Sequence, residues 1–179
     1  MDDEGHSSDA RRLRGRLTTG VTVWTAGTGP AAAGLTVGSV LVADGEPPHL
    51  LGLLGDLADV LDRIRETERF VVHVLAEHQR PVAERFAGQI PVPGGPFRGL
   101  DVEASAHGPV LTELGTRVTC RLAEVTRRGY GMLVDGEIDD VRLGDLDAPL
   151  LHFRGAYRKL GPTGRVWEPP APDRALPYE

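Results

Sequence analysis

At residues 34–39 the chain reads Gly34-Leu35-Thr36-Val37-Gly38-Ser39, and apolar residues continue as far as Val42. The apolar and β-branched side chains predict a strand over residues 35–42. Gly34 and Gly38 carry no Cβ, so another group can come close to the backbone there, while Thr36 and Ser39 add hydroxyl groups. The stretch therefore predicts either a strand in close contact with another backbone or a slot for a flat ligand ring.

Further strands are predicted on both sides of this one. They cover residues 21–25, 49–54, 70–75, 101–106, 118–126, 130–141 and 150–160, with turns at 27–30, 108–109, 128–129 and Gly155. Residues 49–54 are too apolar to have a solvent-facing side, so we expect this strand to be central. Many antiparallel strands with few helices predict a mainly β fold, closed or nearly closed into a barrel, because closure removes exposed strand edges.

Two short helices are predicted between the strands. Asp56 can cap the first helix, because its side-chain oxygen can accept from the free N–H groups of the first turn. The apolar residues of this helix recur at helical spacing, and they are Leu57, Val60, Leu61 and Ile64. The second helix covers residues 81–86, with proline in its first turn and Gly88 as its stop. Residues 89–99 form a loop without an element of its own, and loops of this length are often functional or mobile.

Length and composition allow one domain of 179 residues and argue against several classes of protein. The net charge of -6 argues against a general affinity for nucleic acid. No apolar run approaches the roughly 18 residues of a membrane-spanning helix. The lone Cys120 cannot form an internal disulfide, which suits a reducing cytoplasm. We therefore expect a soluble, cytoplasmic protein without nucleic-acid or membrane partners.

The two ends of the chain differ in composition from the middle. Residues 1–10 are acidic and polar, unlike a secretory signal, and residues 161–179 contain five prolines among polar residues. We expect flexible tails in both places and a single domain over residues 11–160. A basic cluster lies near the start of this domain, formed by Arg11, Arg12, Arg14 and Arg16. We interpret it as a solvated helix face or a partner contact.

Several short segments, taken in their order along the chain, resemble the flavin reductase-like family. They are Thr19-Gly20-Val21-Thr22-Val23, residues 34–39, Pro47-Pro48, Phe70-Val71-Val72-His73-Val74-Leu75, Phe86-Ala87-Gly88 and Pro149-Leu150-Leu151-His152-Phe153-Arg154-Gly155-Ala156-Tyr157. The resemblance covers roughly residues 10–160. It implies an antiparallel FMN-binding split β-barrel, Greek-key-like, with a few short peripheral helices. It also implies a homodimer whose interface helps to form the ligand cleft.

The same resemblance implies a flavin site, with FMN or FAD as cofactor and NAD(P)H as co-substrate. In the family, the stretch that matches residues 34–39 is commonly Gly-x-Thr-x-Ser-Ser, and it lines the flavin. The cofactor-binding candidates on this stretch are Gly34, Thr36, Val37, Gly38 and Ser39. Gly38 stands where the family has the first of its two serines, so one hydroxyl is lost.

A second group of cofactor-binding candidates is Gly55, Asp56 and Leu57. Family members usually carry Ser, Thr, Asn or Arg in this loop, where N–H groups at a helix start hold the phosphate. The carboxylates of Asp56 and Asp59 would repel a phosphate by about 1 kcal/mol per exposed contact at ~4 Å. Both aspartates also suit a helix start that has no ligand. We expect weak FMN binding, a ligand without a phosphate at this place, or no flavin.

The third part of the site departs from the family at Tyr130 and Gly131. Many flavin reductases have Gly-Asp-His here, followed four residues on by Gly-Glu-Val, and the histidine lies beside the nicotinamide and flavin rings. Residues 136–138 keep the end of this pattern as Gly-Glu-Ile, whereas Tyr130 and Gly131 replace the Asp and the His. Tyr130 is the one catalytic candidate. It could stack on a ring, donate a hydrogen bond to a substrate carbonyl, or simply pack at the start of a strand.

Two functions from different classes follow from these observations. The first is an NAD(P)H:flavin oxidoreductase, including the reductase component that serves a flavin-dependent monooxygenase. The alternative is a repurposed split-barrel protein that binds or transforms a small aromatic or polyketide-like molecule without ordinary flavin reduction. The six histidines lack the spacing of metal ligands, so we expect no metal site. His73 stands where the family commonly has Asn, and we expect a hydrogen-bonded core residue there.

Overall fold

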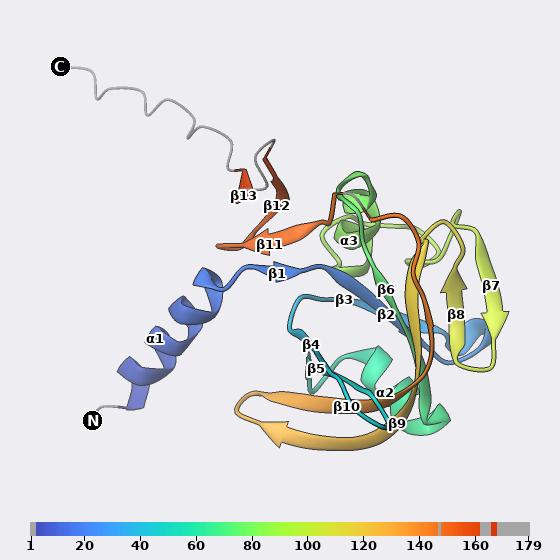
Figure 1. Cartoon of the computed structure of the whole chain (residues 1–179), viewed down its shortest axis with the longest axis horizontal. Helices are drawn as coiled ribbons and strands as arrows, with labels where there is room; N and C mark the ends of the chain where they lie inside the picture. Colours follow the sequence, from blue (N-terminus) through green and yellow to red (C-terminus); the bar gives the residue numbers. More distant parts are fainter. Residues whose placement is uncertain (1–2, 147, 162–165, 168–179) are drawn as a thin grey trace.

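The computed structural model describes residues 3–146, 148–161 and 166–167, and it shows a mainly β protein with a few helices (Figure 1). The strands are β1 (Thr19–Gly20), β2 (Thr22–Ala26), β3 (Ala33–Val37), β4 (Val40–Ala43), β5 (His49–Gly55), β6 (Arg69–Val74), β7 (Val102–Ser105), β8 (Gly108–Leu111), β9 (Thr116–Arg128), β10 (Gly131–Arg142), β11 (Leu151–Phe153), β12 (Ala156–Leu160) and β13 (Val166–Trp167). The helices are α1 (Asp3–Arg16), α2 (Asp59–Thr67) and α3 (Arg80–Phe86), with short 3-10 turns at Gly29–Ala31 and Glu77–Gln79.

The main sheet is antiparallel and has seven strands in the order β3-β2-β6-β9-β10-β5-β4. Its two edge strands, β3 and β4, are consecutive in the chain and are joined by Gly38 and Ser39 alone. The two edges are therefore parts of one bent segment, whose halves pair with β2 and with β5 and not with each other. The expected closed barrel is corrected accordingly, because no ladder among the described residues joins β3 to β4. The strand expected over residues 35–42 is likewise divided into two.

The strand at residues 49–54 was expected at the centre of the sheet, and this expectation was wrong. β9 is central, and β5 lies second from the edge, between β10 and β4. The side chains of β5 alternate between buried and half-buried, so one face of the strand is partly open to solvent. Apolar residues on both faces of β5 predicted that both faces would be buried. Within this chain, the outer face is only partly covered.

Two aromatic rings organise the larger of two hydrophobic cores. Trp24 on β2 stacks on Phe70 on β6, with ring centroids 4.9 Å apart. A Cβ at Gly52 would collide with the Trp24 ring, and a Cβ at Gly136 would collide with the Phe70 ring. These two glycines therefore let β5 and β10 approach the stacked pair, and α2 covers the same core with Val60, Leu61 and Ile64.

The first helix begins later than the sequence predicts. α2 starts at Asp59 with Ala58 as its N-cap, so Asp56 lies in the preceding turn and caps nothing. Leu57 is 92% exposed, because it precedes the helical turns that pack on the core. The second helix, α3, matches its predicted range closely, and Gly88 follows it with a positive φ of 67°.

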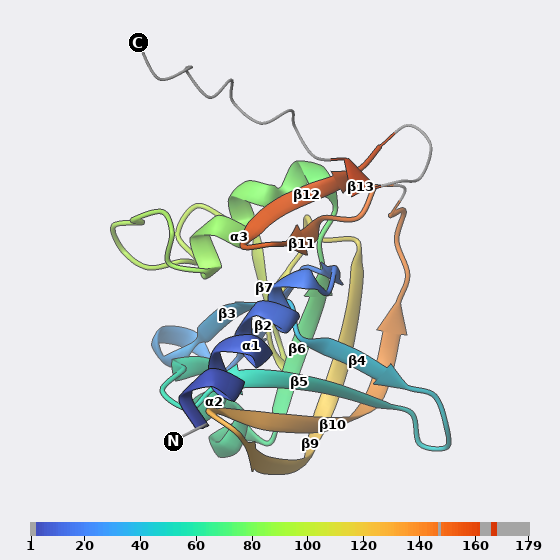
Figure 2. The same ribbon diagram turned by 90° about the vertical axis from the view of Figure 1, so that its left-hand side faces the viewer.

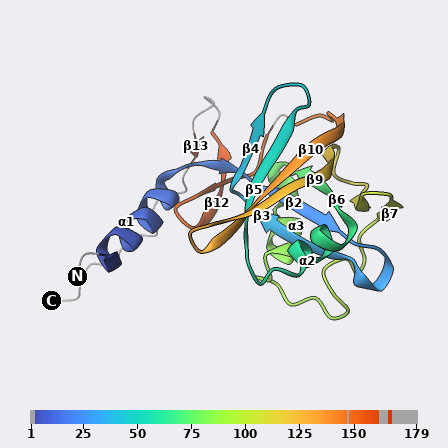
Figure 3. The same cartoon turned by 90° about the horizontal axis from the view of Figure 1, so that it is seen from below.

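The N-terminal helix stands away from the sheets. Helix α1 runs across residue 10, where we placed a boundary between tail and domain, so helical structure begins within the expected tail. Figure 2 shows α1 in front of the strand ends, and Figure 3 shows it projecting from the body of the molecule. Its carboxyl end is held by the N–H of Arg154, which donates to the carbonyl of Gly15 at 2.9 Å.

A narrow second sheet lies beside this helix. It has the order β1-β11-β12-β13, and the predicted turn at Gly155 joins β11 to β12. Most of the C-terminal stretch expected as a tail lies outside the described residues, although β13 belongs to it. In the described part of the chain, no helix is long and apolar enough to span a membrane.

Candidate functional site

The break between β3 and β4 is the centre of the candidate site. Gly38 and Ser39 lie outside both strands. In the described part of the chain, their N–H groups donate none of the backbone hydrogen bonds found in turns and loops. The carbonyl of Ser39 accepts from the N–H of Leu53 at 3.1 Å, which holds the break against β5. Two backbone donors beside small residues fit the edge of a flavin ring, whose carbonyls need donors.

The side chains on this stretch serve packing more than we expected. The Thr36 hydroxyl donates to the carbonyl of Ala83 in α3 at 2.7 Å, and the Ser39 hydroxyl donates to the carbonyl of Leu53 at 2.9 Å. Val37 is buried in the larger core. A Cβ at Gly34 would lie 2.6 Å from the Phe86 ring, so Gly34 is explained by close packing. Of the five candidates on residues 34–39, Gly38 and the backbone of Ser39 remain the most available to a ligand.

The loop at Gly55, Asp56 and Leu57 lies next to the Tyr130 hairpin. Gly55 pairs with Gly131 in the β5–β10 ladder, so the strand register brings the two altered parts of the site together. In Figure 1 the β3–β4 connection lies between β1 and the β9–β10 hairpin, with α1 on the same side. The fold thus brings the Gly55–Leu57 loop and the start of β10 together, whereas Gly34 and Thr36 contact α3.

An arginine partly offsets the acidic loop. A guanidinium nitrogen of Arg127 on β9 lies 3.3 Å from a carboxylate oxygen of Asp56. Both side chains are substantially exposed, so this ion pair is weak. The pair nevertheless places a cation where the sequence indicated only carboxylates. Arg127 was missed because 71 residues separate it from Asp56, and only the hairpin register brings them together.

Tyr130 lies at the tip of the β9–β10 hairpin and is 86% exposed. The interpretation of this tyrosine as packing at a strand start was therefore wrong. Its ring is available to a ligand or to another protein chain. The hairpin projects because β9 and β10 extend beyond the other strands, as Figure 1 shows.

The prediction that His73 is a hydrogen-bonded core residue is confirmed. The side chain is fully buried, and Nε2 accepts from the N–H of Leu111 at 3.0 Å. Nδ1 therefore carries the proton and donates to the carbonyl of Val23 at 3.2 Å. Burial lowers the pKa of His73 to about 4, the hydrogen bond to Val23 raises it in part, and the charge of Arg117 lowers it further. His73 is neutral and structural.

A half-open cavity of about 440 Å³ lies away from these residues. It is lined by the turn after β2, by residues 94–97 of the long loop and by the β7–β8 hairpin. None of the predicted site residues lines this cavity. Its lining among the described residues carries no charged side chain, so it offers no cation to a phosphate.

Comparison with known proteins shows which family the chain belongs to. The family model described as "Flavin reductase like domain" matches residues 14–161, and the chain belongs to this family. It is 32% identical over 156 residues to the NADH-dependent FMN reductase AsuE2 of Streptomyces nodosus subsp. asukaensis, covering 86% of this chain and 84% of the relative. It is 30% identical over 145 residues to the reductase component of 4-hydroxyphenylacetate 3-monooxygenase of Thermus thermophilus, covering 81% of this chain and 91% of the relative.

Solved structures agree with this assignment. The flavin reductase PheA2 in its native state superposes with a TM-score of 0.77 and 27% identity, covering 86% of this chain and 97% of that one. The NADH:FAD oxidoreductase SgcE6 of Streptomyces globisporus C-1027 superposes with a TM-score of 0.76 and 26% identity, covering 87% and 94%. The fold is therefore that of a flavin reductase over most of the chain.

Proposed function

We propose that this chain is an NAD(P)H-dependent flavin reductase that serves as the reductase component of a two-component flavin monooxygenase. The observation that carries the proposal is the family match over residues 14–161, together with relatives named as FMN reductases and as monooxygenase reductase components. We also propose that the functional domain spans residues 11–160 and has the split-barrel architecture of the family. Its cytoplasmic location stays a prediction.

The residues of the chain would bind the flavin and the nicotinamide and orient the two rings toward each other. A flavin supplies the ring that accepts a hydride from reduced nicotinamide, and the protein contributes mainly alignment. The N–H groups of Gly38 and Ser39 would donate to the ring edge, and Arg127 would stand near a phosphate at the Gly55–Leu57 loop. No proton has to come from Tyr130 for hydride transfer. We propose that FMN or FAD is exchanged readily, because Asp56 still opposes a phosphate.

We propose a homodimer as the working form. Several large apolar side chains are exposed, namely Leu13, Leu17, Leu41, Val42 and Leu57, with Tyr130 at the hairpin tip. Monomeric soluble proteins seldom leave many large apolar residues exposed together. A second copy that covers them would enclose the slot at Gly38 and Ser39, which within one chain is open on its outer face.

Steady-state oxidation of NADH and NADPH tests the proposal, with FMN, FAD and riboflavin supplied in turn. We expect turnover that depends on added flavin. A flat absorbance trace with protein that is folded by circular dichroism would reject the reductase assignment.

The second candidate function is the repurposed split barrel, favoured by Tyr130 and Gly131 at the Asp-His positions and by Asp56 in the phosphate loop. Replacing Tyr130 with Phe separates the two. If the protein is a reductase, the rate of NAD(P)H oxidation should change only modestly in this variant, because the phenol donates no proton in hydride transfer. A repurposed cleft that uses the hydroxyl as a donor should lose roughly 100-fold or more in its own reaction.

A further inference from the structure

Three polar side chains stand in a row across the narrow second sheet. Thr19 on β1 pairs with His152 on β11, and His152 pairs with Tyr157 on β12. Residues directly opposite each other in antiparallel ladders point to the same face of the sheet, with Cβ atoms about 4.5–5.5 Å apart. The rings of His152 and Tyr157 accordingly meet edge to face, with centroids 6.0 Å apart. We call these three residues the polar row.

The polar row continues the core-facing side of this sheet. The N–H of Val21 donates to the carbonyl of Leu150 at 3.0 Å, so the contact between the two chain segments extends beyond the β1–β11 ladder. Val21 and Leu150 are both buried in the smaller core. Side chains alternate between the two faces of a strand, so Thr19 and His152, each two residues away, point to that same face. The row therefore faces into the molecule, and its members are half-buried.

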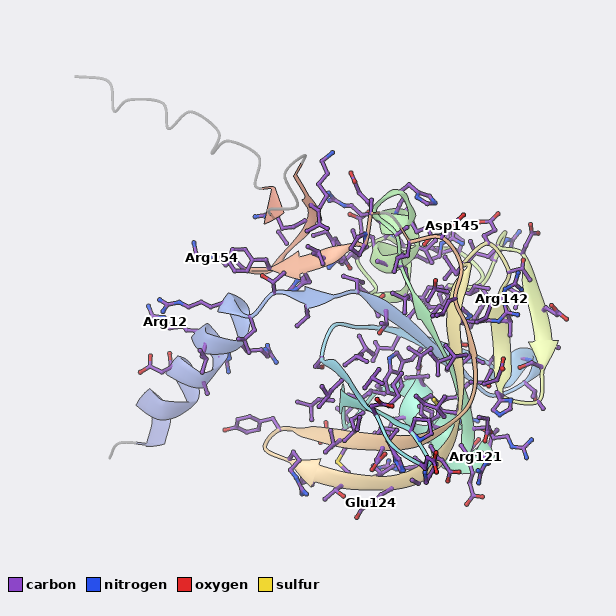
Figure 4. All side chains as sticks on the ribbon, in the orientation of Figure 1. Arg12, Arg121, Glu124, Arg142, Asp145 and Arg154 are labelled. Carbon is purple, nitrogen blue, oxygen red and sulfur yellow. The ribbon has the colours of Figure 1, made fainter. Side chains whose placement is uncertain are left out.

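Thr19 brings the polar row to the slot at Gly38. A Cβ at Gly38 would lie 3.1 Å from the Thr19 hydroxyl. Gly38 stands where the family has a serine, so this hydroxyl lies close to the place of the one that is lost. In Figure 4, Arg154 at the β11–β12 turn and Arg12 on α1 lie on the opposite side of the molecule from the β7–β8 hairpin. The row is therefore separate from the 440 Å³ cavity, which that hairpin lines.

The side chains of the polar row make no hydrogen bonds within the described part of the chain. This holds for the Thr19 hydroxyl, both ring nitrogens of His152 and the Tyr157 hydroxyl. Three further histidines do form hydrogen bonds through their rings, and they are His49, His73 and His107. The polar atoms of the row also remain accessible, because Nε of Arg158 is the one buried side-chain nitrogen or oxygen without a partner among the described residues. Accessible polar groups without a partner are free to bind a ligand.

The polar row is uncharged near neutral pH. Burial lowers the pKa of His152, and nearby arginine charges lower it further. Burial and the charge of Glu84 raise the pKa of Tyr157, which the charge of Arg80 lowers in part. A neutral imidazole has one donor and one acceptor, and each hydroxyl can both donate and accept. The row therefore suits an uncharged group that has a donor beside an acceptor, as an amide does.

We propose that the polar row binds the amide group of a ring that occupies the slot at Gly38. Thr19 lies next to the slot and His152 lies next to Thr19, so these two side chains would make the contacts. Two rings of the proposed reaction carry an amide, namely the flavin in its pyrimidine ring and the nicotinamide in its carboxamide. The identity of the ring rests on the proposed function, whereas binding of the amide can be measured without any redox reaction.

Fluorescence titration with oxidised riboflavin, and calorimetric titration with NAD⁺ in the presence of riboflavin, test the row. The double variant Thr19→Val, His152→Phe keeps the side-chain shapes and removes the polar atoms. We expect it to lose roughly 10-fold or more in affinity for one of the two probes. His78→Phe is the matched control and should bind as the wild type does, because His78 is exposed in the turn at Glu77–Gln79. Unchanged affinity of the double variant for both probes would overturn the proposal, as would a wild type that binds neither.

Two modified probes show whether the amide itself is bound, and from which ring it comes. N3-methylriboflavin lacks the amide N–H of the flavin, and 3-acetylpyridine adenine dinucleotide lacks the amide nitrogen of the nicotinamide. The wild type should bind one modified probe roughly fivefold or more weakly than its parent, and the double variant should bind that pair about equally. The pair that shows this difference identifies the ring. If the wild type binds both modified probes as well as their parents, the amide is not recognised and the proposal is wrong.

Circular dichroism and thermal melting show whether the double variant folds. If it does not, Thr19→Val alone tests the row, because valine has the shape of threonine, and the loss for the same probe should be roughly threefold or more. An unchanged affinity in that variant would count against the proposal. A failure of the proposed function is seen separately, as no NADH oxidation by wild-type protein that does bind riboflavin.

Discussion

At the scale of single residues, Asp56 and Arg127 are the charged side chains that a phosphate at the proposed site would meet. The sequence indicated repulsion from two carboxylates, and the structure adds a cation 3.3 Å from one of them. The balance between these side chains, more than either alone, should set the affinity for FMN.

Replacing Asp56 with Asn should strengthen FMN binding by up to about fivefold, because an exposed charge is worth about 1 kcal/mol or less. Replacing Arg127 with Gln should weaken it by a similar factor. Fluorescence titration measures both affinities, and riboflavin, which has no phosphate, is the control ligand. Equal changes in FMN and riboflavin affinity would show that Asp56 acts on the ring or on the fold instead.

The buried His73 should make stability depend on pH. Its pKa is about 4 in the folded protein against 6.5 ordinarily, so the unfolded chain binds more protons between these values. The contribution of His73 to the free energy of unfolding should therefore be complete above pH ~6.5. The free energy of unfolding should fall by roughly 3 kcal/mol as the pH drops to ~4. Urea unfolding at a series of pH values measures this, and the dependence should be shallower in His73→Asn. An unchanged dependence in that variant would assign the effect to other groups.

At the scale of elements, close glycine contacts hold β5 and β10 against the Trp24–Phe70 pair. Replacing Gly52 with Ala should lower the free energy of unfolding by about 1–3 kcal/mol, since overpacking a core costs this much. Gly55 on the same strand has nothing within 4 Å of its Cβ position, so Gly55→Ala is the matched control. Chemical denaturation compares the two variants. Equal losses would indicate a backbone effect of alanine in β5 and not a collision with the ring.

Elements defined by local pattern were predicted well. α3 and β6 follow proline, glycine and apolar signals that lie within the elements themselves, and their observed ranges differ from the predicted ones by a residue or so. The break at Gly38 could not be predicted, because it arises when one extended segment changes strand partner from β2 to β5. Asp56 was misplaced as a cap for a similar reason, since packing of Val60, Leu61 and Ile64 on the core sets where α2 begins.

The candidate site was predicted only in outline. The resemblance gave residues that the fold does gather, because the β5–β10 register brings Gly55 and Gly131 together. Arg127 belongs to β9, and nothing in one sequence states the register that brings it beside Asp56. The roles of Thr36 and Gly34 were also hidden, since both depend on contacts with α3.

At the scale of the whole molecule, the exposed apolar side chains suggest where a second copy binds. Replacing Leu41, 65% exposed on β4, with Glu should weaken the proposed homodimer at least 10-fold, because a charge would be buried in an apolar interface. Val102 is 41% exposed on β7, and this strand lies apart from β4 in Figure 1, so Val102→Glu is the control. Light scattering after size exclusion measures the mass. A wild-type monomer at high concentration would contradict the homodimer itself.

The single bent segment that forms both edges of the main sheet has a consequence for dynamics. A ligand seated at Gly38 and Ser39 would touch the end of β3 and the start of β4 at once, and would restrain two edges that no hydrogen-bond ladder links. Hydrogen exchange should then slow in β3 and β4 together when flavin is added, while the central β9 is unchanged. The bound cofactor would therefore hold together the two edge strands of the sheet, which no ladder joins.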